Sequence, residues 1–168
     1  MKRFILMTLI VAVVLGFGSG SALAANSLKQ GAAGISVNVD DDFVLSGRYF
    51  VTNDLALLAA FGIGAKGGDA DGTDFGIGVG IRKYLIMDDF APFIGGSFFY
   101  STTRDGDQTD WDLMGEFGAE YFLHKQFSVE GSVGFGYMSS ETDMGATDYE
   151  ETTLGTRRFG LSLNFYFL

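Results

Sequence analysis

Cysteine is absent from the 168-residue chain, histidine and proline occur once each, and basic side chains are few. Without cysteine the chain can form no disulfide scaffold, zinc ribbon or catalytic thiol. A single histidine, His124, is too little for a histidine-based metal site and disfavours hydrolases that need a histidine base. Eleven Lys and Arg against 21 Asp and Glu give a net charge of −10, with no basic stripe that could bind nucleic acid.

Glycine and aromatic residues are abundant instead. The chain has 25 glycines, 17 phenylalanines, 7 tyrosines and one tryptophan. So many aromatic residues argue against disorder, and so much glycine argues against a helical bundle. The length suits one domain or one membrane barrel.

The N-terminus has the three parts of a secretory signal peptide. Lys2 and Arg3 precede an apolar run of 14 residues over 4–17, and Ala22-Leu23-Ala24 provides a small-residue cleavage site. A membrane-spanning helix needs about 20 apolar residues, so the run is too short to be one. We therefore predict a signal peptide over residues 1–24 and one mature domain over 25–168, without a lipobox cysteine for a lipid anchor.

From residue 32 onward, apolar side chains recur at every second position, which is typical of β-strands. The clearest case is residues 75–82, where Phe, Ile, Val and Ile alternate with three glycines and an arginine. Turn-forming residues divide the chain into eight predicted strands, over 32–39, 42–51, 55–65, 74–86, 90–103, 109–123, 127–139 and 153–168.

The connectors between these strands alternate in length. Three have three residues each, over 52–54, 87–89 and 124–126, and three are longer, over 66–73, 104–108 and 140–152. Only Asp40–Asp41 is short where the pattern requires a long connector. Bacterial outer-membrane barrels alternate in this way, because their periplasmic turns are short and their outer loops are long.

A soluble β-sandwich would also produce alternating strands. Three features favour a membrane barrel instead. The non-apolar face carries mainly glycine with isolated charges, which does not suit a solvated sheet. Most strands have roughly 10 to 14 residues, enough to cross a bilayer at a tilt. Aromatic residues gather near strand ends, as in an interfacial girdle: Tyr49, Phe50, Tyr84, Trp111, Tyr121, Phe122, Tyr137, Tyr166 and Phe167.

Specific stretches carry a family resemblance. They are residues 118–123 (GAEYFL) followed by a short turn and 127–131 (FSVEG), residues 91–96 (APFIGG), and the C-terminal alternation of Leu163, Phe165 and Phe167. In these stretches the mature chain resembles the small outer-membrane β-barrels of the OmpA, OmpX and OmpW type, although it ends on Leu168 where an aromatic residue is usual.

We thus predict an all-β fold: an eight-stranded antiparallel up-and-down transmembrane β-barrel in a bacterial outer membrane. The resemblance implies contact with outer-membrane lipid and lipopolysaccharide, insertion by the barrel-assembly machinery, a monomer, and a structural or surface-interaction role. An alternative is a narrow channel for small hydrophobic compounds, as proposed for OmpW-type relatives. Eight strands leave a lumen about wide enough for their own side chains, which disfavours a general porin.

Catalysis, cofactors and metals are not expected. Lipid A deacylases of similar size use a histidine–serine pair, but His124 lies in a predicted periplasmic turn beside Lys125. The stretch Asp69–Asp74 (DADGTD) has carboxylates at spacings that a calcium loop could use, but it lacks the full pattern and the terminal glutamate. We interpret it, like the acidic stretch over 140–152, as a solvated loop that could meet an external partner. Arg104 and Arg157 are candidates for pairing with lipopolysaccharide phosphates or, equally, with the acidic loops.

If the apolar face meets lipid, the opposite parity directs six charged residues into the lumen: Arg48, Arg82, Glu116, Glu120, Glu130 and Arg158. Isolated buried charges cost several kcal/mol each, so we predict an ion network that plugs the barrel and fixes its register. We expect Arg82, Glu120 and Glu130 near the periplasmic ends of the strands and the other three nearer the middle. Separate hydration by lumen water is the alternative.

Signal cleavage gives the first testable prediction. When the full chain is expressed in a Gram-negative cell, intact-mass spectrometry of the membrane fraction should find a mature protein that begins near Ala25, because Ala22-Leu23-Ala24 fits signal peptidase. A membrane-bound product that retains Lys2 and Arg3 would contradict it.

Overall fold

The computed structural model describes residues 28–38, 44–66, 72–103, 108–143 and 148–167. The predicted signal peptide lies outside these residues. Within them no helix has the length and apolarity needed to cross a membrane. The strands are β1 (Ala33–Asn38), β2 (Val44–Phe50), β3 (Leu55–Lys66), β4 (Gly72–Tyr84), β5 (Phe90–Thr103), β6 (Gln108–His124), β7 (Phe127–Asp143) and β8 (Asp148–Phe167).

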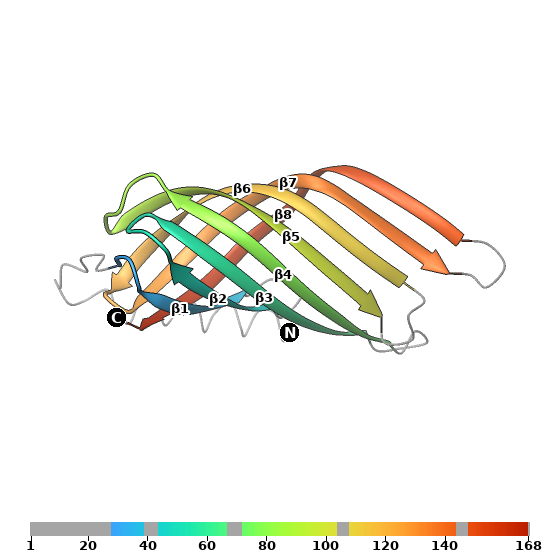
Figure 1. The fold of residues 1–168 in the computed structure, drawn as a ribbon, viewed down its shortest axis with the longest axis horizontal. Coiled ribbons are helices and arrows are strands. Elements are labelled where there is room, and N and C mark those ends of the chain that lie inside the picture. Colours follow the sequence, from blue (N-terminus) through green and yellow to red (C-terminus); the bar gives the residue numbers. More distant parts are fainter. Residues whose placement is uncertain (1–27, 39–43, 67–71, 104–107, 144–147, 168) are drawn as a thin grey trace, which may run out of the picture.

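The eight strands pair in chain order and close into one barrel (Figure 1), since β1 is antiparallel to both β2 and β8. The predicted eight-stranded antiparallel up-and-down barrel is confirmed. The strands are strongly tilted, as barrel closure requires. Ala33 pairs directly with Phe167, whereas the path of paired residues from Ala33 around the other strands reaches Thr156, eleven residues earlier on β8.

The alternation of side chains makes the barrel apolar outside and polar inside. On β4 the side chains of Ile77, Val79 and Ile81 are about half exposed, whereas Arg82 is 3 % exposed. On β6 Phe117 is 63 % exposed and Glu120 is fully buried. This arrangement is the reverse of a water-soluble protein, in which charged residues are the ones almost never buried.

Strand lengths differ around the barrel, and here the sequence-based prediction was partly wrong. β1 and β2 have six and seven residues, whereas β7 and β8 have 17 and 20 and project further at the end opposite the C-terminus (Figure 1). Most of the predicted loop over 140–152 is paired strand, with Ser140 opposite Glu151 and Thr142 opposite Tyr149. The sequence did not show this because polar residues occupy both faces there, so no apolar period marks the strand.

Inward-facing glycines make room for large lumen side chains. At Gly118 on β6 a Cβ atom would overlap the carbonyl oxygen of Gly131 and would lie 2.6 Å from Cζ of Phe93. Gly131 on β7 is exposed on the outer face instead, where an added Cβ would have no atom within 4 Å. The first glycine is therefore required by packing and the second is not.

These two glycines form a matched pair for a stability test. Gly118→Ala should lower the free energy of unfolding by about 1–3 kcal/mol because the methyl group overpacks the lumen, whereas Gly131→Ala should leave it nearly unchanged. Urea titration of the protein refolded in lipid vesicles measures both values. Equal effects of the two substitutions would show that the faces of β6 and β7 are wrongly assigned.

Candidate functional site

A buried carboxylate, Glu120 on β6, lies at the centre of the polar groups in the lumen. Its two oxygens accept hydrogen bonds from five side chains: the hydroxyls of Tyr84 (2.7 Å), Tyr166 (2.6 Å) and Ser128, the amide of Asn164 (3.0 Å) and the guanidinium of Arg48 (2.9 Å). These donors come from β2, β4, β7 and β8. Hydrogen bonds to the charged form are what allow an ionised carboxylate to be buried.

Arg48 on β2 links Glu120 to a second carboxylate. Its Nη1 lies 2.9 Å from Glu120 Oε2 and its Nη2 lies 2.8 Å from Glu130 Oε2, and the side chains of all three residues are at most 4 % exposed. Nη1 also donates to the hydroxyls of Tyr84 (2.7 Å) and Tyr166 (2.5 Å). Nε of Arg48 is buried and has no hydrogen-bond acceptor among the described residues.

Arg82 on β4 continues the chain of ion pairs. Its Nη1 lies 2.6 Å from the same Glu130 oxygen, and its Nη2 lies 2.8 Å from Oε1 of Glu116. The guanidinium also lies over the ring of Phe93, with Cζ 3.7 Å from the ring centre. The result is one continuous network, Glu120–Arg48–Glu130–Arg82–Glu116, in which Glu130 is shared by both arginines.

An aromatic layer closes the lumen below this network, at the end where the short turns lie. Phe50 stacks on Tyr84 at 5.5 Å between ring centres and contacts Tyr166 at 6.2 Å, while Tyr84 contacts Phe93 at 5.8 Å. Leu28, which precedes β1, is buried in the same apolar cluster. The lumen is therefore filled by apolar groups at this end and by ion pairs above them.

The structure brings five of the six predicted charged residues together, but as one network and not in the two predicted groups. Arg48 lies with Glu120 and Glu130 because its side chain points toward the aromatic layer. In the backbone register Arg158 lies opposite Gly134, and Arg157 is the extra residue of a β-bulge. The side chains of both lie outside the described part of the chain.

Sequence reasoning missed the polar partners of these charges. The sequence did contain a signal for these partners, namely their parity. The inward parity of Arg82, Glu130 and Arg158 is shared by four polar residues on the same strands: Tyr84, Ser128, Asn164 and Tyr166. Four aromatic residues expected in the interfacial girdle point into the lumen instead, with relative exposures of at most 2 %: Phe50, Tyr84, Phe122 and Tyr166. They were misassigned because position near a strand end was weighed without strand parity.

The remaining predicted sites are resolved only in part. Arg104 and most of Asp69–Asp74 lie outside the described residues. His124 is exposed at the end of β6, where its Nδ1 accepts a hydrogen bond of 3.4 Å from the backbone N–H of Gln126. In the described ranges no group of three His, Cys, Asp or Glu residues could hold a metal ion.

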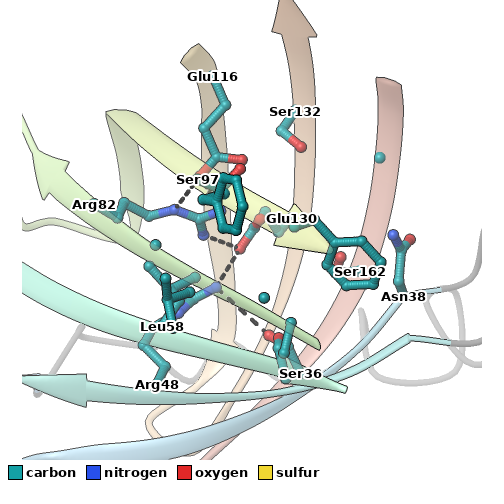
Figure 2. Close-up of a pocket in the computed structure, with 18 residues that line it drawn as sticks. Ser36, Asn38, Arg48, Leu58, Arg82, Ser97, Glu116, Glu130, Ser132 and Ser162 are labelled. Carbon is teal, nitrogen blue, oxygen red and sulfur yellow. Dashed lines mark hydrogen bonds and ion pairs between the residues drawn. The ribbon is translucent and has the colours of Figure 1, made fainter. Parts of the chain in front are cut away.

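A cavity of about 90 Å³ lies on the side of the network away from the aromatic layer (Figure 2). Arg48, Arg82, Glu116 and Glu130 form its charged floor, and serines from several strands line its wall. The lumen is thus filled at the end where the short turns lie, and it contains this cavity on the other side of the network.

Comparison with known proteins places this architecture among small outer-membrane barrels. The structure is similar to OprG, an outer membrane protein from Pseudomonas aeruginosa, with a TM-score of 0.59 at 13 % identity over 84 % of this chain and 98 % of that one. It is also similar to outer membrane protein W of E. coli (TM-score 0.55, 14 % identity, 84 % and 100 %). A third similar structure is the N-terminal β-barrel domain of OprF from P. aeruginosa (0.52, 14 %, 83 % and 99 %). These chains share its fold.

No family model matches the sequence, and no curated protein matches it. At these identities the similarity concerns backbone architecture. Every argument about the lumen therefore depends on the side chains of this chain.

The shared position of Glu130 leads to a stability prediction. Glu130→Ala should cost about 3–5 kcal/mol, because it leaves two buried guanidinium groups with one partner fewer each. Glu116→Ala should cost clearly less, since Arg82 keeps Glu130 and the Glu116 side chain is 17 % exposed. Urea unfolding in lipid vesicles measures both values, and adding Arg82→Met to Glu130→Ala should recover part of the loss. Equal losses for the two glutamates would contradict the network.

Proposed function

We propose that this protein is a small integral barrel of a bacterial outer membrane, with a plugged lumen and an acidic external hairpin, and that its role is structural or surface interaction and not catalysis. The observation that carries the proposal is a continuous apolar belt on the outside of a barrel whose charges lie inside. In water such a surface would be a severe aggregation liability, whereas lipid tails solvate it.

Two pairs of aromatic residues mark the lower and upper edges of this belt and so define its height. Phe90 pairs with Tyr121 at one end, Tyr100 pairs with Trp111 at the other, and the two levels are ten residue steps apart on each strand. Ten strand residues at about 3.3 Å each, tilted about 40° from the barrel axis, span roughly 25 Å, the height of the apolar band in outer-membrane barrels. All four side chains are at least 36 % exposed, as lipid-facing girdle residues must be.

A charged residue at the lower edge of the belt is consistent with this boundary. Lys83 lies on the outer face of β4, and its ammonium group pairs with Asp54 in the turn between β2 and β3. This hydrogen bond and a second one from the Thr52 hydroxyl lower the pKa of Asp54. A lysine that reaches toward a turn carboxylate at a strand end is expected at a membrane–water interface.

The orientation follows from the lengths of the connections. We place the short turns, the C-terminal end of β8 and residues 28–32 in the periplasm, because periplasmic turns of such barrels are short. The projecting ends of β7 and β8 are then external. Exposed Glu141 lies directly opposite exposed Glu150, with Glu151 next to it. Like charges in directly opposed positions destabilise a hairpin. Such an arrangement is more consistent with a surface that binds a partner than with one that only stabilises the barrel.

The lumen gives no support to the alternative of a channel for hydrophobic compounds. Its lower end is filled, which leaves no through-channel, and above the network serines, glycines and charged groups line the cavity together with Leu58, Ala60 and Phe99. Monomeric state, insertion by the barrel-assembly machinery and pairing of Arg104 and Arg157 with lipopolysaccharide remain part of the proposal.

Cell fractionation and proteolysis test location and orientation together. The mature protein should require detergent for extraction and should show heat-modifiable gel mobility. Glutamyl endopeptidase added to intact cells should cut near Glu141, Glu150 or Glu151 and spare the lumen glutamates. As a control, trypsin should cut at Lys125 only after the outer membrane is opened. Recovery in the soluble periplasmic fraction, or cleavage at Lys125 in intact cells, would refute the proposal.

A further inference from the structure

The cavity above the ion network has a wall of hydroxyl groups from separate strands. Ser36 lies on β1, Ser46 on β2, Ser97 on β5, Ser132 on β7 and Ser162 on β8, and all five line it. Figure 2 shows Ser36, Ser97, Ser132 and Ser162 at separate points around the charged groups of Arg48, Arg82 and Glu130. A purely structural plug does not require this space, because larger side chains at the same positions would fill it.

Small residues keep the cavity open. Gly78, Gly80 and Gly160 also line it. A Cβ atom at Gly160 would lie 2.9 Å from the Ser132 hydroxyl oxygen, so any larger residue would press on that group. Glycine thus occupies inward positions of two strands, β4 and β8, beside the cavity, whereas the inward residues nearer the short turns include tyrosine, phenylalanine and arginine.

The floor of the cavity selects against a charged occupant. Arg48 and Arg82 both hold Glu130, and Arg82 also holds Glu116, within buried ion pairs of 2.6–2.8 Å. The four charges that line the cavity sum to zero. An anion or a cation would therefore have to displace an internal partner and leave a buried charge unpaired, which is strongly unfavourable.

The polar groups of the cavity suit a ligand with hydroxyl groups. The Glu116 side chain is 17 % exposed and lines the cavity, whereas Nε of Arg48 is buried from it. A hydroxyl group of a bound molecule can donate to the Glu116 carboxylate, and the serine hydroxyls can both donate to it and accept from it. The apolar side chains of Leu58 and Phe99, which also line the cavity, offer contact to carbon-bound hydrogens.

We propose that this cavity, with its volume of about 90 Å³, is a binding site for a small uncharged polyol, a molecule with adjacent hydroxyl groups and no larger than glycerol. The occupant enters from the external end, because the aromatic layer closes the other end. The inference depends on the closed barrel and not on its membrane location.

Binding is tested with the full mature chain refolded in detergent micelles, with glycerol as the probe and backbone amide NMR shifts as the readout. We expect saturable shifts near Ser97 and Ser132. Ser97→Leu, which fills the cavity, should weaken binding at least tenfold, and Gly160→Ala provides a second, smaller obstruction from another strand. Gly96→Leu is the matched control, because it adds the same side chain one residue away on the lipid face.

Heat-modifiable mobility establishes that each variant forms the barrel before binding is compared. The absence of saturable shifts with glycerol in the wild-type protein would overturn the proposal, since it would leave only water in the cavity. Equal affinity in Ser97→Leu would overturn the site. Saturable shifts of equal size with acetate or glycine betaine would overturn the selection for an uncharged ligand. A chain that fails the fractionation test above but binds glycerol would refute the membrane location alone.

Discussion

The pairing of buried charges inside the barrel is the constraint on which the other features depend. Three carboxylates and two guanidinium groups from four strands share one connected set of hydrogen bonds, and Glu130 serves both arginines. Removing one buried charge leaves its partner unpaired. The resulting loss of stability is far larger than any stability that the whole set provides over apolar side chains packed in its place. The network therefore favours one strand register above all others, since a shift of one strand by one residue would carry the charges of that strand to the apolar face.

The two halves of the lumen follow from this constraint. Next to the network the inward residues are large, and glycines such as Gly118 leave the space that these side chains occupy. Beyond it many are serine or glycine, beside Leu58 and Phe99, which leaves a cavity whose floor is the outer surface of the network. The same ion pairs thus fill the lumen on one side and form the floor of the cavity on the other, so the proposed plug and the proposed polyol site share one set of residues.

Much of the architecture was predictable because alternation is a local signal. Residues 75–82 alone predict one apolar outer face and one face toward the lumen, and parity selected five charged residues that the structure joins. Parity could not show which of these residues contact one another. Those contacts depend on strand tilt, and the step of eleven residues around the barrel brings Arg48 to Glu120 and not to the middle of the lumen. The ends of β7 and β8 were missed for a different reason, because polar residues occupy both of their faces and no apolar period marks them.

The junction between β1 and β8 gives the internal network a further consequence. Backbone pairing closes the barrel over only six residue pairs, Ala33–Asn38 against Ser162–Phe167. Across that junction Ser36 bonds to Asn164, and Arg48 reaches over β1 to Tyr166. The first and last strands of the chain are thus joined by side chains as well as by their short ladder. The barrel can close only after its last strand, β8, has been added. Side chains that lie entirely within the lumen then reinforce this closure.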